Sequence, residues 1–160
     1  MTEIITLFTR IKTGNNGTDG DVFVGIGGRE FCIDSGEPDP GYDDFEKNDD
    51  RTYICGEMPA LVPPDSTQIK GSSFNDPRSH FPLDTNNLNE YPVYLRFEQR
   101  HDEDLWRLQY VSVDVFTPGP TLSAKYEALD ADDDEINLVL GPDFGNFVYL
   151  HKVSGEPPPT

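Results

Sequence analysis

Apolar and polar residues alternate with a period of two along most of this chain, which is the pattern of half-buried β-strands. In one segment, for example, Val111, Val113 and Val115 all fall on one face. The segments with this pattern are residues 4–12, 21–27, 29–34, 51–55, 91–100, 106–116, 121–129, 135–141 and 146–152. Each is flanked by Gly, Pro, Asn or Asp, and no window keeps a helical period over three turns. The pattern predicts an all-β protein: a two-sheet antiparallel β-sandwich of about eight strands.

The length of 160 residues favours a single domain, which we place at residues 1–153. Residues 57–91 interrupt the alternation and are rich in Pro, Ser, Asn and Asp, so they predict a long insertion that is either functional or disordered. Its larger apolar residues are Phe74, Phe81 and Leu83. They either pin the insertion to the sandwich or form a patch that binds a partner, and we favour the first interpretation. Residues 154–160 predict a flexible Pro-rich tail.

The charge balance narrows the range of partners. The chain has 30 acidic and 12 basic residues, a formal net charge of −18. Such a surface repels phosphate backbones and anionic headgroups, so we expect no nucleic-acid partner and no direct binding to a bare anionic membrane. The sequence lacks both an apolar run of about 18 residues and the pattern of a signal peptide. We therefore expect a cytoplasmic protein, one that can still lie peripherally at a membrane.

Two cysteines, Cys32 and Cys55, form no CxxC pair, and both lie in strand-like segments. Buried free thiols are the interpretation we favour, with a single disulfide bridge as the alternative.

Motifs for catalysis are missing from this sequence. The run from Gly25 to Gly28 begins like a dinucleotide fingerprint, but Glu30 occupies a glycine position and no helix is predicted to follow. The three histidines, His80, His101 and His151, are far apart and lack zinc-ligand spacing. With 30 carboxylates some pair must resemble a hydrolase dyad, so such a pair carries no information. We expect no enzymatic activity, and keep a carboxylate-based hydrolase as a minor hypothesis because fold alone does not settle function.

Acidic loops make Ca²⁺ the candidate ligand, because this hard cation prefers oxygen ligands on loops that fold around it. Three loops are rich in Asp, Glu or Asn: residues 13–21, 34–50 and 101–104. Loops at one end of a sandwich converge, so carboxylates that are distant in sequence can share one site. The competing interpretation is a solvated acidic rim without a metal. A further acidic run at residues 130–135 fails as an EF-hand, since Glu135 and Gly141 occupy the positions that need Gly and Glu.

Three short motifs follow one another in these loops and the strands beside them. They are Gly17-Thr18-Asp19, Asp44-Phe45-Glu46, and the strand that carries Trp106, Leu108, Val111 and Val113. Their order and the strand pattern over residues 4–56 and 92–116 resemble the PLAT domain, the module of polycystins, lipoxygenases and alpha-toxin. The resemblance implies an eight-stranded sandwich without catalytic activity that binds lipid or protein partners. Many members of that family bind Ca²⁺ at one end of the sandwich, and the metal bridges to phospholipid headgroups.

The resemblance also implies the positions of metal ligands. Carried over by position, the ligand residues are Asn15, Gly17, Thr18, Asp34, Asp44 and Asp104. Extra residues from Gly36 to Gly41 enlarge the second loop, and the insertion at 57–91 has no clear counterpart in the family. Trp106 and Tyr42 are candidate partner-binding residues, although Trp106 begins a core strand and packing beneath the loops is the interpretation we favour for it.

The alternative function is an acidic structural or protein-interaction sandwich that needs no metal. In that case the acidity serves solubility, for example in a high-salt cytoplasm, and the fold should lose stability as salt is removed.

Overall fold

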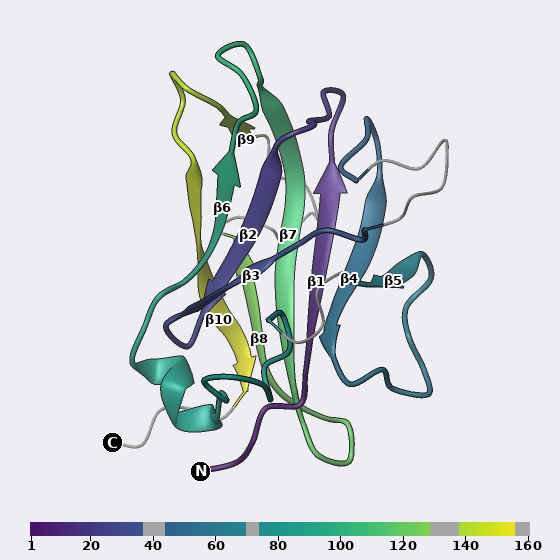
Figure 1. The fold of residues 1–160 in the computed structure, drawn as a ribbon, viewed down its shortest axis with the longest axis vertical. Helices are drawn as coiled ribbons and strands as arrows, with labels where there is room; N and C mark the ends of the chain where they lie inside the picture. Colours follow the sequence, from purple (N-terminus) through teal and green to yellow (C-terminus); the bar gives the residue numbers. More distant parts are fainter. Residues whose placement is uncertain (37–43, 70–73, 129–137, 156–160) are drawn as a thin grey trace.

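The computed structural model describes residues 1–36, 44–69, 74–128 and 138–155, and the protein is all-β (Figure 1). Its elements are β1 (Thr6–Thr13), β2 (Asp21–Ile26), β3 (Arg29–Cys32), β4 (Asp50–Gly56), β5 (Ser66–Gln68), the short 3₁₀ helix η1 (Thr85–Asn89), β6 (Val93–Glu98), β7 (Trp106–Thr117), β8 (Thr121–Ala128), β9 (Leu138–Leu140) and β10 (Phe147–Gly155). Each of the nine alternating segments overlaps one of these strands, so the prediction of an all-β protein is confirmed.

The strands form one hydrogen-bonded sheet in the order β3-β2-β6-β10-β8-β7-β1-β4-β5, and β9 pairs separately with β7. The pair β4–β5 is parallel, and the other pairs are antiparallel. The sheet curls, so that strands from both of its halves contribute to a single buried cluster (Figure 1). The loops that follow β1 and β6 lie at one end of this sheet, and the N-terminus lies at the other.

The core is built from the alternating positions, because in a strand every second side chain faces the same side. Val111, Val113 and Val115 are all buried in the cluster, as the pattern predicts. Trp106 and Leu108 are also buried there, although they belong to the opposite parity. The β1–β7 ladder explains this change of parity, since its register shifts between Lys12 and Thr13 and a β-bulge moves the strand by one residue.

The long insertion is attached to the sheet. Leu83 and Leu88 are buried in the core cluster, so Leu83 does pin this segment as predicted. The guanidinium of Arg29 also donates hydrogen bonds to four of its backbone carbonyls, at Phe74, Asp76, Ser79 and Phe81, over 3.0–3.3 Å. The rings of Phe74 and Phe81 do not take part in the anchoring: they are 71% and 83% exposed.

Both cysteines are free, as the favoured interpretation predicts, but only Cys55 is also buried as predicted. Cys55 is fully buried and Cys32 is partly buried, and burial raises the pKa of Cys32 to about 11. The last strand, β10, ends at Gly155 and so includes the first two residues of the predicted tail. Among the residues that the structure describes, none forms a helix long and apolar enough to cross a membrane.

Candidate functional site

Three loops meet at one end of the sheet, and we call residues 14–20, 44–49 and 99–105 together the loop end (Figure 1). Backbone hydrogen bonds join them. The amide of Thr18 donates to the carbonyl of Phe45 over 3.1 Å, and the amide of Asn48 donates to the carbonyl of Gly14 over 2.8 Å. The side-chain amide of Asn16 donates to the carbonyl of Leu105 over 2.7 Å. The first loop is therefore held against both of the others.

Thr18 and Asp104 form the buried centre of the loop end, with only 7% and 6% of their surfaces exposed. The Thr18 hydroxyl donates to Oδ1 of Asp104 over 2.7 Å, and it accepts from the amide of Gly20 over 2.9 Å. The amide of Arg100 donates to Oδ2 of Asp104 over 3.0 Å. Both carboxylate oxygens of Asp104 thus accept hydrogen bonds from the protein itself, which is how a buried charge is stabilised.

Gly17 lets the first two loops approach this closely. A Cβ atom at this position would lie 2.5 Å from the carbonyl oxygen of Phe45 and 2.9 Å from the amide nitrogen of Lys47. Both are backbone atoms, so neither can rotate away as a flexible side chain would. The absence of a side chain at Gly17 is thus a requirement of loop packing.

An aromatic layer lies beneath the loops. The ring of Phe45 packs against Tyr53 and Trp106, with centroids 5.5 and 5.4 Å apart, and Trp106 packs against Phe97 at 5.5 Å. Trp106 is fully buried, and its indole N–H donates to the hydroxyl of Thr13 over 3.1 Å. Its burial supports packing beneath the loops and corrects its assignment as a partner-binding residue. Tyr42, the other candidate, lies outside the described residues.

The two predicted metal ligands of the second loop, Asp34 and Asp44, have hydrogen-bond partners outside the buried centre of the loop end. Asp44 accepts hydrogen bonds from the amide of Ser35 over 3.0 Å and from the hydroxyl of Tyr53 over 3.2 Å. Asp34 accepts from the amide of Gly36 over 2.8 Å. Burial is the largest cause of the raised pKa of Cys32, and the negative charges of Asp34, Asp21 and Asp44 raise it further.

The predicted ligand set is therefore divided between two groups. Gly17, Thr18 and Asp104 come together at the loop end, whereas Asp34 and Asp44 are linked to each other through Ser35. Asn15 is exposed on the first loop.

A shallow hollow of about 330 Å³ opens on the loop end, and some of the residues that line it are not among the predicted metal ligands. Its lining residues are Asn16, Gly17, Thr18, Asp19, Glu46, Lys47, His101, Glu103, Asp104 and Leu105. Three exposed carboxylates among them, those of Asp19, Glu46 and Glu103, come from three different loops. All three belong to the acidic loops that the sequence identifies. Their negative charge was the only feature of the sequence that indicated a role in binding a cation.

The oxygen-rich lining fits the ligand preference of Ca²⁺, which takes carboxylate, amide and carbonyl oxygens. Within the described part of the chain, however, no three His, Cys, Asp or Glu side chains are already grouped closely enough to hold a metal ion. The exposed carboxylates of this hollow would have to turn inward to share one cation.

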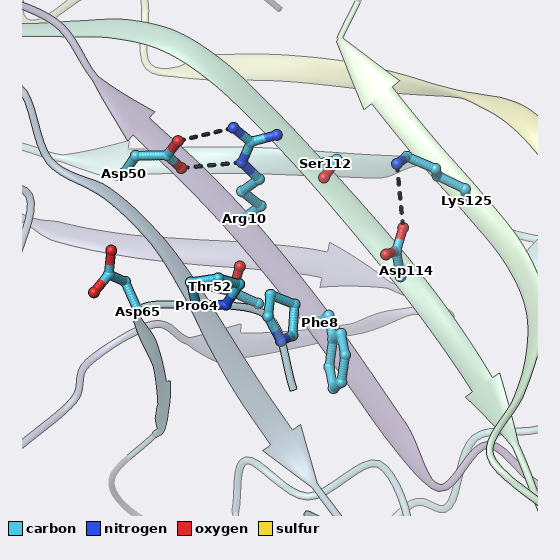
Figure 2. A pocket seen from close by; sticks show the side chains of 10 residues that line it. Phe8, Arg10, Asp50, Thr52, Pro64, Asp65, Ser112, Asp114 and Lys125 are labelled. Carbon is cyan, nitrogen blue, oxygen red and sulfur yellow. Dashed lines mark hydrogen bonds and ion pairs between the residues drawn. The ribbon is translucent and has the colours of Figure 1, made fainter. Parts of the chain in front are cut away.

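A second hollow, of about 460 Å³, lies on the outer face of β4, β1, β7 and β8 (Figure 2). Arg10 donates two hydrogen bonds to Asp50, over 3.0 and 2.8 Å, and these lower the pKa of that carboxyl. Lys125 lies 4.0 Å from Asp114, whose pKa is raised by burial although this lysine opposes the shift. The cations that line this hollow are thus paired with carboxylates of the same chain.

Comparisons of this chain with models of known protein families, with curated proteins and with solved structures find no match. The resemblance to the PLAT family therefore stays a prediction.

Proposed function

We propose that this protein is a non-catalytic, PLAT-like recognition module in which the curled sheet serves as a two-layered antiparallel sandwich. In this proposal the loop end binds Ca²⁺ and, through the metal, a lipid headgroup or a protein partner. The observation that carries the proposal is the hollow lined by Asp19, Glu46 and Glu103, three carboxylates from three loops that hydrogen bonds hold together.

Electrostatics gives the reason for a cation at this position. Carboxylates that share a hollow repel one another, and a divalent cation relieves that repulsion. A chain of net charge −18 also needs a bridge before it approaches an anionic lipid surface. The ligands we assign are Asp19, Glu46 and Glu103, with the side-chain oxygen of Asn16. Thr18 and Asp104 are assigned to hold the loops in place, because their polar atoms already bond to the protein.

A Ca²⁺ titration followed by calorimetry and thermal unfolding tests the metal site. At a hundredfold excess over Kd, binding adds about 2.7 kcal/mol of stability, which for this chain length raises Tm by about 5–11 °C. We expect Glu46→Gln combined with Glu103→Gln to abolish the rise. A matched double variant, Glu3→Gln with Glu90→Gln, removes the same charge near the opposite end of the sheet and should keep it. Equal Tm values in Ca²⁺ and in EDTA would remove the metal from the proposal.

Sedimentation with vesicles then identifies the target. Binding to phosphatidylserine vesicles that requires Ca²⁺ supports a metal bridge to anionic lipid. If the protein binds Ca²⁺ but does not sediment with the vesicles, a protein partner is the target that the proposal retains.

The second candidate is an acidic structural or protein-interaction sandwich without a metal. It is favoured by one observation: Asp44 and Asp104, two carboxylates of the predicted ligand set, accept their hydrogen bonds from the chain itself. In that case removal of salt lowers stability, because screening no longer relieves the self-repulsion of the acidic surface. Stability that does not depend on ionic strength would count against this candidate.

A further inference from the structure

An aromatic cluster covers part of the outer face of the sheet, on the side opposite the buried cluster. We call Phe23, Tyr94, Phe147 and Tyr149 the aromatic platform. They lie on the neighbouring strands β2, β6 and β10, where Tyr94 pairs with Tyr149 in the ladder (Figure 1). The rings of Phe147 and Tyr149 stack at an angle of 13° with centroids 6.2 Å apart, and Tyr94 lies 5.5 and 6.3 Å from them. Phe147 is 49% exposed and Tyr149 is 63% exposed, so the platform presents ring surface to solvent.

The centre of the platform is held in place. Tyr94 lies across Gly25 on the neighbouring strand, where a Cβ atom would overlap its ring. Its hydroxyl donates to Glu30 on β3 over 2.7 Å. Burial and this hydrogen bond raise the pKa of Tyr94 to about 12, so the hydroxyl stays protonated and the contact persists at neutral pH. A surface fixed in this way loses little conformational entropy when a partner covers it.

The platform already carries one cation of its own. Arg96 lies over the ring of Phe23 at 4.2 Å, and its Nε and Nη2 atoms each donate to a different oxygen of Glu30 over 2.9 Å. Its Nη1 atom donates to Glu98 over 3.1 Å. On this face of the sheet, the chain itself thus places a guanidinium over an aromatic ring and pairs it with neighbouring carboxylates.

Charge decides which occupant fits the rest of the platform. A second copy of the chain, a nucleic acid or an anionic lipid would each bring negative charge to a protein of charge −18. Carboxylates lie at one edge of the platform: Glu98 follows Arg96, the ladder partner of Phe147, on the same face of β6, and Asp21 pairs with Glu98 from β2. Aromatic faces attract cations, and a carboxylate rim adds to that attraction.

From this charge complementarity we propose that the aromatic platform is the docking surface for a basic segment of a protein partner. Arg or Lys side chains of that segment lie over Phe147 and Tyr149 and pair with the bordering carboxylates. The site goes beyond the proposed Ca²⁺-dependent function and requires no metal.

A synthetic peptide of alternating Arg and Ser tests this inference, because alternate residues of an extended chain face the same side. The titration is carried out calorimetrically with the unmodified 160-residue chain at about 150 mM salt, where the Debye length is about 8 Å. EDTA is present, so the outcome does not depend on whether the loop end binds Ca²⁺. The control peptide carries citrulline in place of Arg, which keeps the shape of the side chain and removes its charge.

The decisive variant is Phe147→Ser with Tyr149→Ser. We expect it to weaken peptide binding about tenfold, which corresponds to two exposed cation–π contacts. The matched control, Phe74→Ser with Phe81→Ser, removes two rings that are even more exposed, outside the platform, and should change Kd less than twofold. The proposal is overturned if the platform variant binds like the unmodified protein, or if the citrulline peptide binds as tightly as the Arg peptide.

Nuclear magnetic resonance keeps the test decisive even where the platform variant fails to fold. In the unmodified protein, ring resonances of Phe147 and Tyr149 should shift as the Arg peptide is added. Peptide binding that leaves these resonances in place would show that the peptide sits elsewhere on the acidic surface and would refute the assignment.

Discussion

Replacing Thr18 by Val removes one hydroxyl from the buried centre of the loop end and keeps the shape of the side chain. Two hydrogen bonds are lost: the one donated to Asp104 and the one accepted from the amide of Gly20. A hydrogen bond to a charged group contributes about 1.5–3 kcal/mol, and an amide left without its acceptor in a buried position costs about 1–3 kcal/mol. Because the loops can relax in part, we expect a loss near the lower end of the combined range of about 2.5–6 kcal/mol, about 3 kcal/mol.

Urea unfolding at neutral pH, followed by circular dichroism, measures this loss, and thermal unfolding should show a decrease in Tm of about 6–12 °C. Thr18→Ser is the control, since it keeps the hydroxyl and loses one methyl group, worth about 1 kcal/mol. A double-mutant cycle with Asp104→Asn separates the hydroxyl–carboxylate contact from the other effects of each change. If Thr18→Val costs no more than Thr18→Ser, or if the cycle gives a coupling below about 0.5 kcal/mol, this pair does not hold the loops together.

Two further variants test the electrostatics of the outer face by their pH dependence, each measured from urea midpoints. Hydrogen bonds from Arg96 lower the pKa of Glu30, so its contribution is present at neutral pH and is lost as the pH falls through the folded-state pKa. Glu30→Gln should therefore cost about 0.5–1 kcal/mol at pH 7, and this cost should disappear as the pH falls through the folded-state pKa of Glu30. Burial raises the pKa of Asp114, although Lys125 opposes the shift, so ionisation of this carboxyl disfavours the folded state as the pH rises through the folded-state pKa. The stability of Asp114→Asn relative to the unmodified protein should thus increase between pH 4 and pH 7, and a difference that is constant with pH would contradict this account.

The alternation of apolar residues located the nine principal strands because each of these strands buries one face only. It did not locate β5, which has three residues, none of them fully buried. That strand forms through its parallel pairing with β4, and the local sequence pattern does not predict a contact between these two segments. The element η1 was missed for a related reason: its single buried residue, Leu88, sets no period, and its cap at Asp84 consists of polar residues typical of loops.

The meeting of the acidic loops was predictable, but the partners of each carboxylate were not. Asp44 and Glu46 are two residues apart, yet Asp44 bonds to Ser35 and Tyr53 while Glu46 lines the hollow of the loop end. Phe45 lies between them in the left-handed region, at a φ of 60°, which turns the chain at this point. The positions of acidic residues in the sequence show where negative charge lies along the chain. The direction in which each side chain points depends on the backbone turn, and tertiary contacts stabilise that turn.

The two proposed surfaces share a border, and their electrostatics are opposed. Asp21 and Glu98 form the ladder pair at the edge of the aromatic platform, and Gly20, next to Asp21, packs against the backbone of Glu98 beside Asp104. In the function we propose, a Ca²⁺ ion bound at the loop end adds two positive charges near this border. The added positive charge therefore strengthens the attraction between the loop end and an anionic headgroup. It weakens the attraction between the aromatic platform and a basic segment. If both surfaces are functional, the metal selects between two kinds of partner.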